Sequence, residues 1–130
     1  MKSRLSLLAA FLFSLTAAMA ADVPKITPTE AVQRVASGKA VLVDVREPSE
    51  WAEAGVAAPA VLLPMSDFNG EKKLWKLFLE NNAGKEIIVY CRSGNRSGQV
   101  AQKLADDGKT VANAGAFKDW VAADLPVRQP

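Results

Sequence analysis

The single cysteine of the chain, Cys91, lies where a thiol can be held as an anion. An apolar run over 87–90 leads directly into it, and a helical pattern opens at Ser97 and continues to Asp107. The thiol is therefore expected at the end of a strand, in the loop that leads to a helix N-terminus. Backbone N–H groups converge at such a position and the helix dipole favours negative charge, so both effects lower the pKa of a thiol and make it a nucleophile.

The residues after Cys91 distinguish it from a buried, inert cysteine. An inert cysteine packs as a small hydrophobe among apolar side chains. The loop here contains arginines, serines, an asparagine and a glycine that permits a tight turn, and these residues cannot form an apolar pocket. We interpret Cys91 as a catalytic thiol. The residues expected to bind its substrate are Arg92, Ser93, Gly94, Asn95, Arg96 and Ser97.

This loop, Cys-Arg-Ser-Gly-Asn-Arg-Ser over 91–97, resembles the active-site loop of the single-domain rhodaneses, a family of thiosulfate sulfurtransferases. The stretch 42–51, in which a strand ends in Asp-Val-Arg, is similar to the family's upstream signature, and 111–127 resembles its closing segment. Three motifs therefore occur in the family's order. The chain departs from the family at 55–60, where the usual histidine is missing, and at 115–116, where Gly-Ala replaces Gly-Gly.

The resemblance implies a two-step transfer of sulfane sulfur through a persulfide on Cys91. The thiolate would take sulfur from a small anionic donor such as thiosulfate and pass it to a thiophilic acceptor, either cyanide or a thiol. Loop N–H groups from Arg92 to Ser97 would stabilise the anionic sulfur in both states. No cofactor is expected.

The loop side chains have different expected roles. Arg96 lies where the family's loop arginine does and either faces the substrate or holds the loop. Arg92 is expected at the rim, where it would draw in anionic donors or stay an ordinary solvated charge. Ser93 and Ser97 could donate hydrogen bonds to a sulfonate group, and Ser97 could equally be the N-cap of the following helix.

Asp44 and Arg46 of the upstream signature are interpreted as scaffold. Alternate strand residues point the same way, so both side chains emerge on one side and could hold the active-site loop or its neighbour. A preformed thiolate needs no general base, which argues against a catalytic role for either residue.

Two other functions use similar residues. Cysteine phosphatases and arsenate reductases have Cys-x5-Arg, whereas Cys91 to Arg96 is one residue shorter and its ring of amides should fit a sulfur atom better than phosphate. A non-catalytic persulfide carrier or sulfur-binding partner protein would share every residue named above, and only turnover with a free acceptor separates the two. The chain has no histidine, which excludes a Cys-His dyad and, with one cysteine, argues against a metal site.

Residues 1–20 have the pattern of a secretory signal peptide, with basic residues Lys2 and Arg4, an apolar stretch, and Ala-Met-Ala before a cleavage site after Ala20. The predicted location is the periplasm, and the chain is similar in this respect to small periplasmic rhodaneses of the phage-shock type. Without Lys2 and Arg4 the 16 basic residues fall to 14, equal to the acidic ones. This balance predicts no nucleic-acid partner and no membrane attachment after cleavage.

Residues 21–130 are expected to form a single rhodanese-like α/β domain, with a mostly parallel sheet of about five strands and helices on both faces. The alternating pattern predicts strands at 40–45, 61–63, 87–90 and 110–112. It predicts helices at 28–36, 48–54, 71–81, 97–107 and 116–122. Trp75 and Phe78 are expected in the core because of their helical spacing. Asp44 and Cys91 end two strands, so both should lie at the carboxyl edge of the sheet, where ligands bind in such folds.

Overall fold

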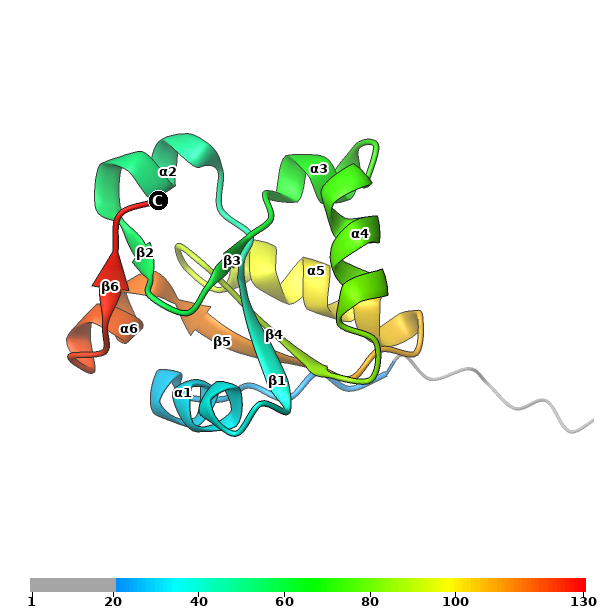
Figure 1. Ribbon diagram of the computed structural model, residues 1–130, viewed down its shortest axis with the longest axis horizontal. Helices are drawn as coiled ribbons and strands as arrows, with labels where there is room; N and C mark the ends of the chain where they lie inside the picture. The colour runs from blue at the N-terminus through cyan, green and yellow to red at the C-terminus, as the bar shows by residue number, and fades with distance from the viewer. Residues whose placement is uncertain (1–20) are drawn as a thin grey trace, which may run out of the picture.

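The computed structural model describes residues 21–130, and the predicted signal peptide with its cleavage after Ala20 lies outside them. A four-stranded parallel sheet forms its centre (Figure 1). Its spatial order is β3 (Val61–Leu62), β1 (Ala40–Asp44), β4 (Glu86–Cys91) and β5 (Val111–Ala116). The predicted α/β class is confirmed, with four strands where about five were expected. A single parallel bridge between Lys25 and Asn113 continues the sheet beyond β5.

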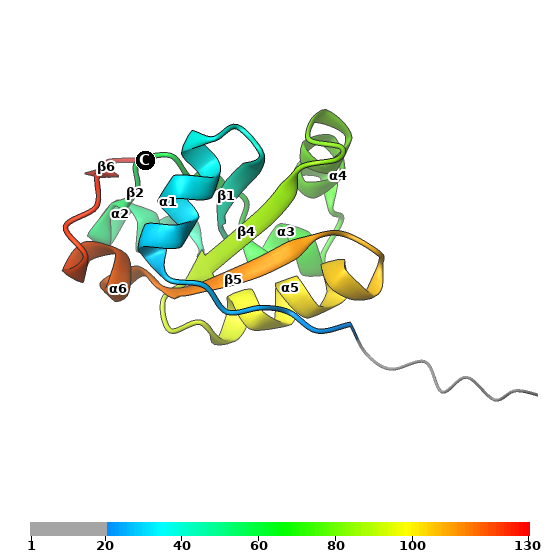
Figure 2. The same cartoon turned by 90° about the horizontal axis from the view of Figure 1, so that it is seen from below.

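Helices cover both faces of this sheet, as the alternating pattern predicts. One face carries α3 (Met65–Asn69), α4 (Lys73–Asn81) and α5 (Asn95–Asp106), and the other carries α1 (Pro28–Ala36) and α6 (Phe117–Ala122) (Figure 2). Trp75 and Phe78 are buried in the first layer, which confirms their place in the core. Strand alternation divides β4 between the layers, so Cys91 faces α5 whereas Tyr90 faces α6.

Short pairings and side-chain caps account for the differences from the predicted elements. Helix α2 (Pro48–Ala54) has the predicted bounds, but β2 (Val56–Ala57) and β6 (Val127–Arg128) form a separate antiparallel pair that was not predicted. The predicted helix at 71–81 begins only at Lys73, because the Asp67 carboxylate of the unpredicted helix α3 accepts the N–H groups of Leu74 and Trp75, both at 3.1 Å.

Two elements that lie next to the predicted active-site loop, one after it in the chain and one beside it in space, are longer than expected. Helix α5 begins at Asn95, two residues before the predicted start, and Gly94 precedes it with a φ of +93°. Strand β5 continues to Ala116, where a strand ending at 112 was expected, with a register shift opposite Val89 and Tyr90. Because β4 ends at Cys91 and α5 begins at Asn95, only three residues lie between them. Within residues 21–130, no helix is long and apolar enough to cross a membrane.

Candidate active site

Cys91 is the last residue of β4, and the three-residue loop that follows folds back over its sulfur. The Gly94 N–H donates to Cys91 Sγ at 3.0 Å, and Ser97 Oγ lies 3.3 Å from the same atom. A side chain at position 94 would meet Gly115 Cα at 3.3 Å in a backbone conformation that side chains rarely adopt. Glycine at 94 is therefore required both by the turn and by the close approach of β5.

Burial and hydrogen bonding act in opposite directions on the Cys91 thiol. Burial raises its pKa, because desolvation disfavours the anion. Hydrogen bonds from the Ser97 hydroxyl and from the N–H groups of Ser97, Ser93 and Gly94 outweigh this effect, so the pKa lies below the ordinary value for cysteine. The loop therefore favours the thiolate form of Cys91 without any histidine in the chain.

Asn113 on β5 ties the loop together, and the sequence analysis did not identify it. Its Oδ1 lies 2.8 Å from Ser97 Oγ, whose single hydrogen is shared between this oxygen and Cys91 Sγ. The same Oδ1 accepts from the Gly115 N–H at 3.0 Å, and Nδ2 donates to the Gly94 carbonyl at 3.1 Å. Asn113 is buried, so each of these groups would lose a partner without it. Ser97 is a buried residue within α5 and not the N-cap, which is Gly94.

Arg96 binds Glu50 and so links the start of α5 to α2. Its two terminal nitrogens donate to the two carboxylate oxygens at 2.6 and 2.7 Å. This bidentate bond lowers the pKa of Glu50 to about 2, against a smaller opposing effect of burial. Of the two expected roles for Arg96, the geometry corresponds to holding the loop.

Asp44 and Arg46 bind each other at the carboxyl end of β1, next to the end of β4. Arg46 donates through Nη2 to Asp44 Oδ2 at 2.8 Å and to the Gly55 carbonyl at 2.7 Å, and its guanidinium lies 4.3 Å from the centre of the Phe117 ring. Both side chains are almost fully buried. They fix the end of β1 against α2 and α6, and form no hydrogen bond to the residues of the 91–97 loop.

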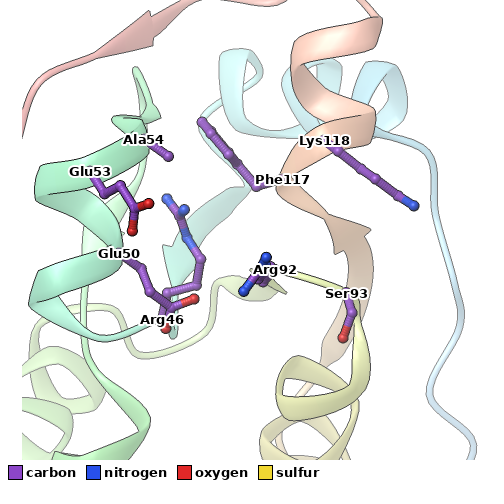
Figure 3. A pocket seen from close by; sticks show the side chains of 8 residues that line it. All are labelled: Arg46, Glu50, Glu53, Ala54, Arg92, Ser93, Phe117 and Lys118. Atoms are coloured by element: carbon purple, nitrogen blue, oxygen red, sulfur yellow. The ribbon is translucent and has the colours of Figure 1, made fainter.

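A hollow of about 580 Å³ opens beside the loop, between α2 and the start of α6 (Figure 3). Two predicted substrate-binding residues, Arg92 and Ser93, line it together with Arg46 and Glu50. Its remaining lining residues were not predicted as a site: Glu53, Ala54, Phe117 and Lys118. Cys91 itself has no exposed surface and lines neither this hollow nor the second one described below.

The other predicted substrate-binding residues do not share this hollow. Gly94 and Asn95 line a second hollow of about 920 Å³, which lies between α5 and the segment around Lys25 and is also lined by Ser93. The loop therefore separates two cavities, with the thiol buried beneath it. No cluster of three or more potential metal ligands occurs among residues 21–130.

The family model and the named relatives that match this chain indicate one family. The model of the rhodanese-like domain matches residues 27–123. The uncharacterized protein YqhL of Bacillus subtilis is 38% identical over 96 residues, which cover 72% of this chain and 71% of that protein. The thiosulfate:glutathione sulfurtransferase of Saccharomyces cerevisiae is 37% identical over 92 residues, which cover 63% of this chain and 65% of that protein.

A solved structure supports the fold independently. A rhodanese-related protein from Thermoplasma volcanium matches with a TM-score of 0.68 over 82% of this chain and 99% of its own, at 24% sequence identity. At that identity the likeness concerns the arrangement of sheet and helices rather than the reaction.

Proposed function

This chain belongs to the rhodanese-like domain family, and from that premise we propose that it transfers sulfane sulfur from thiosulfate, or a similar anionic donor, to a thiophilic acceptor through a persulfide on Cys91. The observation that supports this most is the set of hydrogen-bond donors around Cys91 Sγ, which favours a thiolate. The name of the yeast relative, a thiosulfate:glutathione sulfurtransferase, agrees with this chemistry.

In the first step the Cys91 thiolate attacks the outer sulfur of thiosulfate. A bond forms between Sγ and that sulfur, the sulfur–sulfur bond of the donor breaks, and sulfite leaves with the bonding electrons. The charge moves to the terminal sulfur, where the N–H groups of Ser93, Gly94 and Ser97 can stabilise it. Arg92, exposed at the rim of the hollow, attracts the anionic donor.

In the second step cyanide or a thiolate attacks the terminal sulfur. The new bond forms to the acceptor, the bond to Sγ breaks, and its electrons return to Cys91 as the thiolate. No proton, metal or external electron carrier is needed for balance. The same N–H groups therefore stabilise the anionic sulfur in both steps.

Steady-state production of thiocyanate from thiosulfate and cyanide tests the proposal, with a phosphate ester as a parallel substrate. We expect thiocyanate from the wild type, none from Cys91→Ser, and no phosphate release from either. Hydrolysis of the ester without thiocyanate formation would instead indicate a phosphatase. A persulfide that forms but is not passed to cyanide or thiols would indicate a sulfur carrier.

A further inference from the structure

A short segment before the first helix lies along β5, on the side away from β4 (Figure 2). This strap, residues 23–26, forms a single parallel bridge between Lys25 and Asn113. The Asn113 N–H donates to the Pro24 carbonyl at 2.9 Å, and the Asn113 carbonyl accepts from the Ile26 N–H at 3.0 Å. The strap therefore binds both backbone polar groups of Asn113, the residue whose side chain ties the active-site loop together.

The contacts of the strap fall where the pairing of β5 with β4 is irregular. Asn113 is paired with Val89 and Gly115 with Tyr90, so the intervening Ala114 has no partner on β4. A bulge of this kind interrupts the ladder of hydrogen bonds and lets the strand bend. The strap thus supplies backbone contacts at the point where β4 holds the strand least regularly.

The strap is itself anchored in both layers of the fold. The Val23 side chain packs against the core cluster that contains Cys91, and the Ile26 side chain packs against the cluster on the other face of the sheet. Just before the strap, the Ala21 carbonyl accepts from Gln102 Nε2 of α5 at 2.7 Å. These contacts fix the strap independently of its two bonds to β5, so it can support that strand.

The strap reaches the sulfur only through Asn113. In the described part of the chain, no hydrogen bond joins the strap directly to the loop 91–97. The Asn113 side chain lies 2.8 Å from Ser97 Oγ and donates to the Gly94 carbonyl at 3.1 Å. Ser97 Oγ and the Gly94 N–H lie in turn 3.3 and 3.0 Å from Cys91 Sγ. A continuous path of hydrogen bonds therefore runs from the strap to the thiol.

On the premise of the proposed sulfur transfer, we propose that the strap is a positioning element of the reaction. By holding the backbone of Asn113, it keeps the side chain of that residue on the loop and the hydrogen-bond donors of the loop on the sulfur. Pro24 and Ile26 act through their backbone groups and do not touch the sulfur. Because those donors lower the pKa of Cys91, a detached strap raises it, and less thiolate is present at any pH below the ordinary pKa.

Two proline substitutions in the full chain separate the strap's hydrogen bond from its other properties. Ile26→Pro removes the N–H that the Asn113 carbonyl accepts. Lys25→Pro is the matched control, because the Lys25 N–H forms no backbone hydrogen bond within residues 21–130. The rate of iodoacetamide alkylation is measured against pH, and circular dichroism checks the fold. The alkylation curve should move to higher pH for Ile26→Pro and overlay the wild type for Lys25→Pro.

A folded Ile26→Pro protein with the wild-type curve would overturn the inference, as would an equal shift in both proline variants. If Ile26→Pro does not fold, Ile26→Ala decides in its place, because it keeps the N–H but loses the side chain that anchors the strap. Its curve should shift, whereas the curve of Val35→Ala, a partly buried residue of the same cluster on α1, should not. Identical curves for these two variants would count against the strap.

The alkylation titration needs no sulfur donor, so it separates the strap from the proposed function. A shifted curve for Ile26→Pro, together with a wild type that forms no persulfide from thiosulfate, would support the strap's hold on the thiol and refute the sulfur transfer. A wild type that forms the persulfide, together with unshifted curves for the folded variants, would refute the role of the strap alone.

Discussion

At Cys91 the cost of burying a charge competes with the hydrogen bonds that stabilise it. A free cysteine has a pKa of about 8.5, and a fully buried thiol without partners would lie above that value. The Gly94 N–H at 3.0 Å and the Ser97 hydroxyl at 3.3 Å reverse the direction of the shift. Because the folded pKa is lowered, the stabilisation of the thiolate is complete above the ordinary pKa and is lost as pH falls through the folded pKa.

Ser97→Ala should raise the pKa of Cys91, since the variant removes a hydroxyl hydrogen bond that favours the thiolate. The rate of iodoacetamide alkylation, measured against pH, gives the pKa of the thiol directly. Ser93→Ala is the matched control, because residue 93 contributes its backbone N–H and not its hydroxyl. Overlapping curves for Ser97→Ala and wild type would mean that the hydroxyl does not stabilise the thiolate.

Asn113→Ala should both destabilise the protein and raise the pKa of Cys91. The variant leaves the Gly94 carbonyl and the Gly115 N–H without their side-chain partner, at a cost of about 2 kcal/mol in the free energy of unfolding. The less ordered loop would then hold its N–H groups less firmly on the sulfur. Urea denaturation and the alkylation titration measure the two effects.

Asn82→Ala is the control for Asn113, because Asn82 makes one side-chain bond to the Phe78 carbonyl at the end of α4. It should lower stability by about 1 kcal/mol and leave the thiol pKa unchanged. A destabilised Asn113→Ala protein with a normal thiol pKa would show that Asn113 supports the fold without tuning the sulfur.

Some of these residues could be predicted from the sequence and others could not. Cys91 and its loop form a contiguous motif, and strand, turn and helix signals locate them without tertiary information. Asn113 contacts Ser97 across 16 residues, and Glu50 contacts Arg96 across 46. An asparagine near the end of a strand or a glutamate in a short helix has no local signal for such a contact, so only the packing of β5 and α2 reveals it.

At the scale of elements, the Arg96–Glu50 pair is the bond that joins the first turn of α5 to α2. Both side chains are partly exposed, at 31% and 24%, so solvent screens the interaction. The pair matters because α2 forms one side of the hollow, which Glu53 lines, and α5 directly follows the loop that contains the hydrogen-bond donors to Cys91 Sγ. Its loss should let these two elements separate more readily.

Glu50→Gln should remove a pH-dependent part of the stability. The pKa of Glu50 is lowered to about 2, so its contribution is complete above the ordinary pKa of about 4.3 and is lost as pH falls through about 2. After discounting for screening, we expect about 1 kcal/mol. Urea titrations at pH 6 and at about pH 2.5 should show a smaller difference between the two pH values for Glu50→Gln than for wild type.

Glu53→Gln is the control on the same helix, because Glu53 forms no ion pair within residues 21–130. It should reproduce the wild-type pH dependence of stability. If Glu50→Gln also reproduces it, the Arg96–Glu50 bond contributes nothing measurable in solution and the two elements are held by packing alone.

At the scale of the whole molecule, the order of strands and helices could be predicted because each central strand is an apolar run bounded by turn residues. That order also places Asp44 and Cys91 at one edge of the sheet. The pairing of β2 with β6 could not be predicted, since each is two residues long and the partners Val56 and Arg128 are far apart in sequence. Such a pair depends on the rest of the fold to bring these two distant segments together.

The location of the whole molecule is also open to test. We propose that the chain is exported to the periplasm, with cleavage after Ala20. The basic start, apolar stretch and Ala-Met-Ala site are the grounds for it. N-terminal sequencing of protein recovered from the periplasm of a Gram-negative host should begin at Ala21, reading Ala-Asp-Val-Pro. A full-length product confined to the cytoplasm would contradict the proposal.

The central claim is that Cys91 carries the transferred sulfur, and intact-protein mass spectrometry after incubation with thiosulfate tests it most directly. We predict a mass increase of one sulfur atom in the wild type, located on the peptide that contains Cys91 and removed by cyanide. Cys91→Ser, which has no other thiol to replace it, should remain folded and unmodified. An unmodified wild type, or a Cys91→Ser variant that still transfers sulfur, would contradict the account.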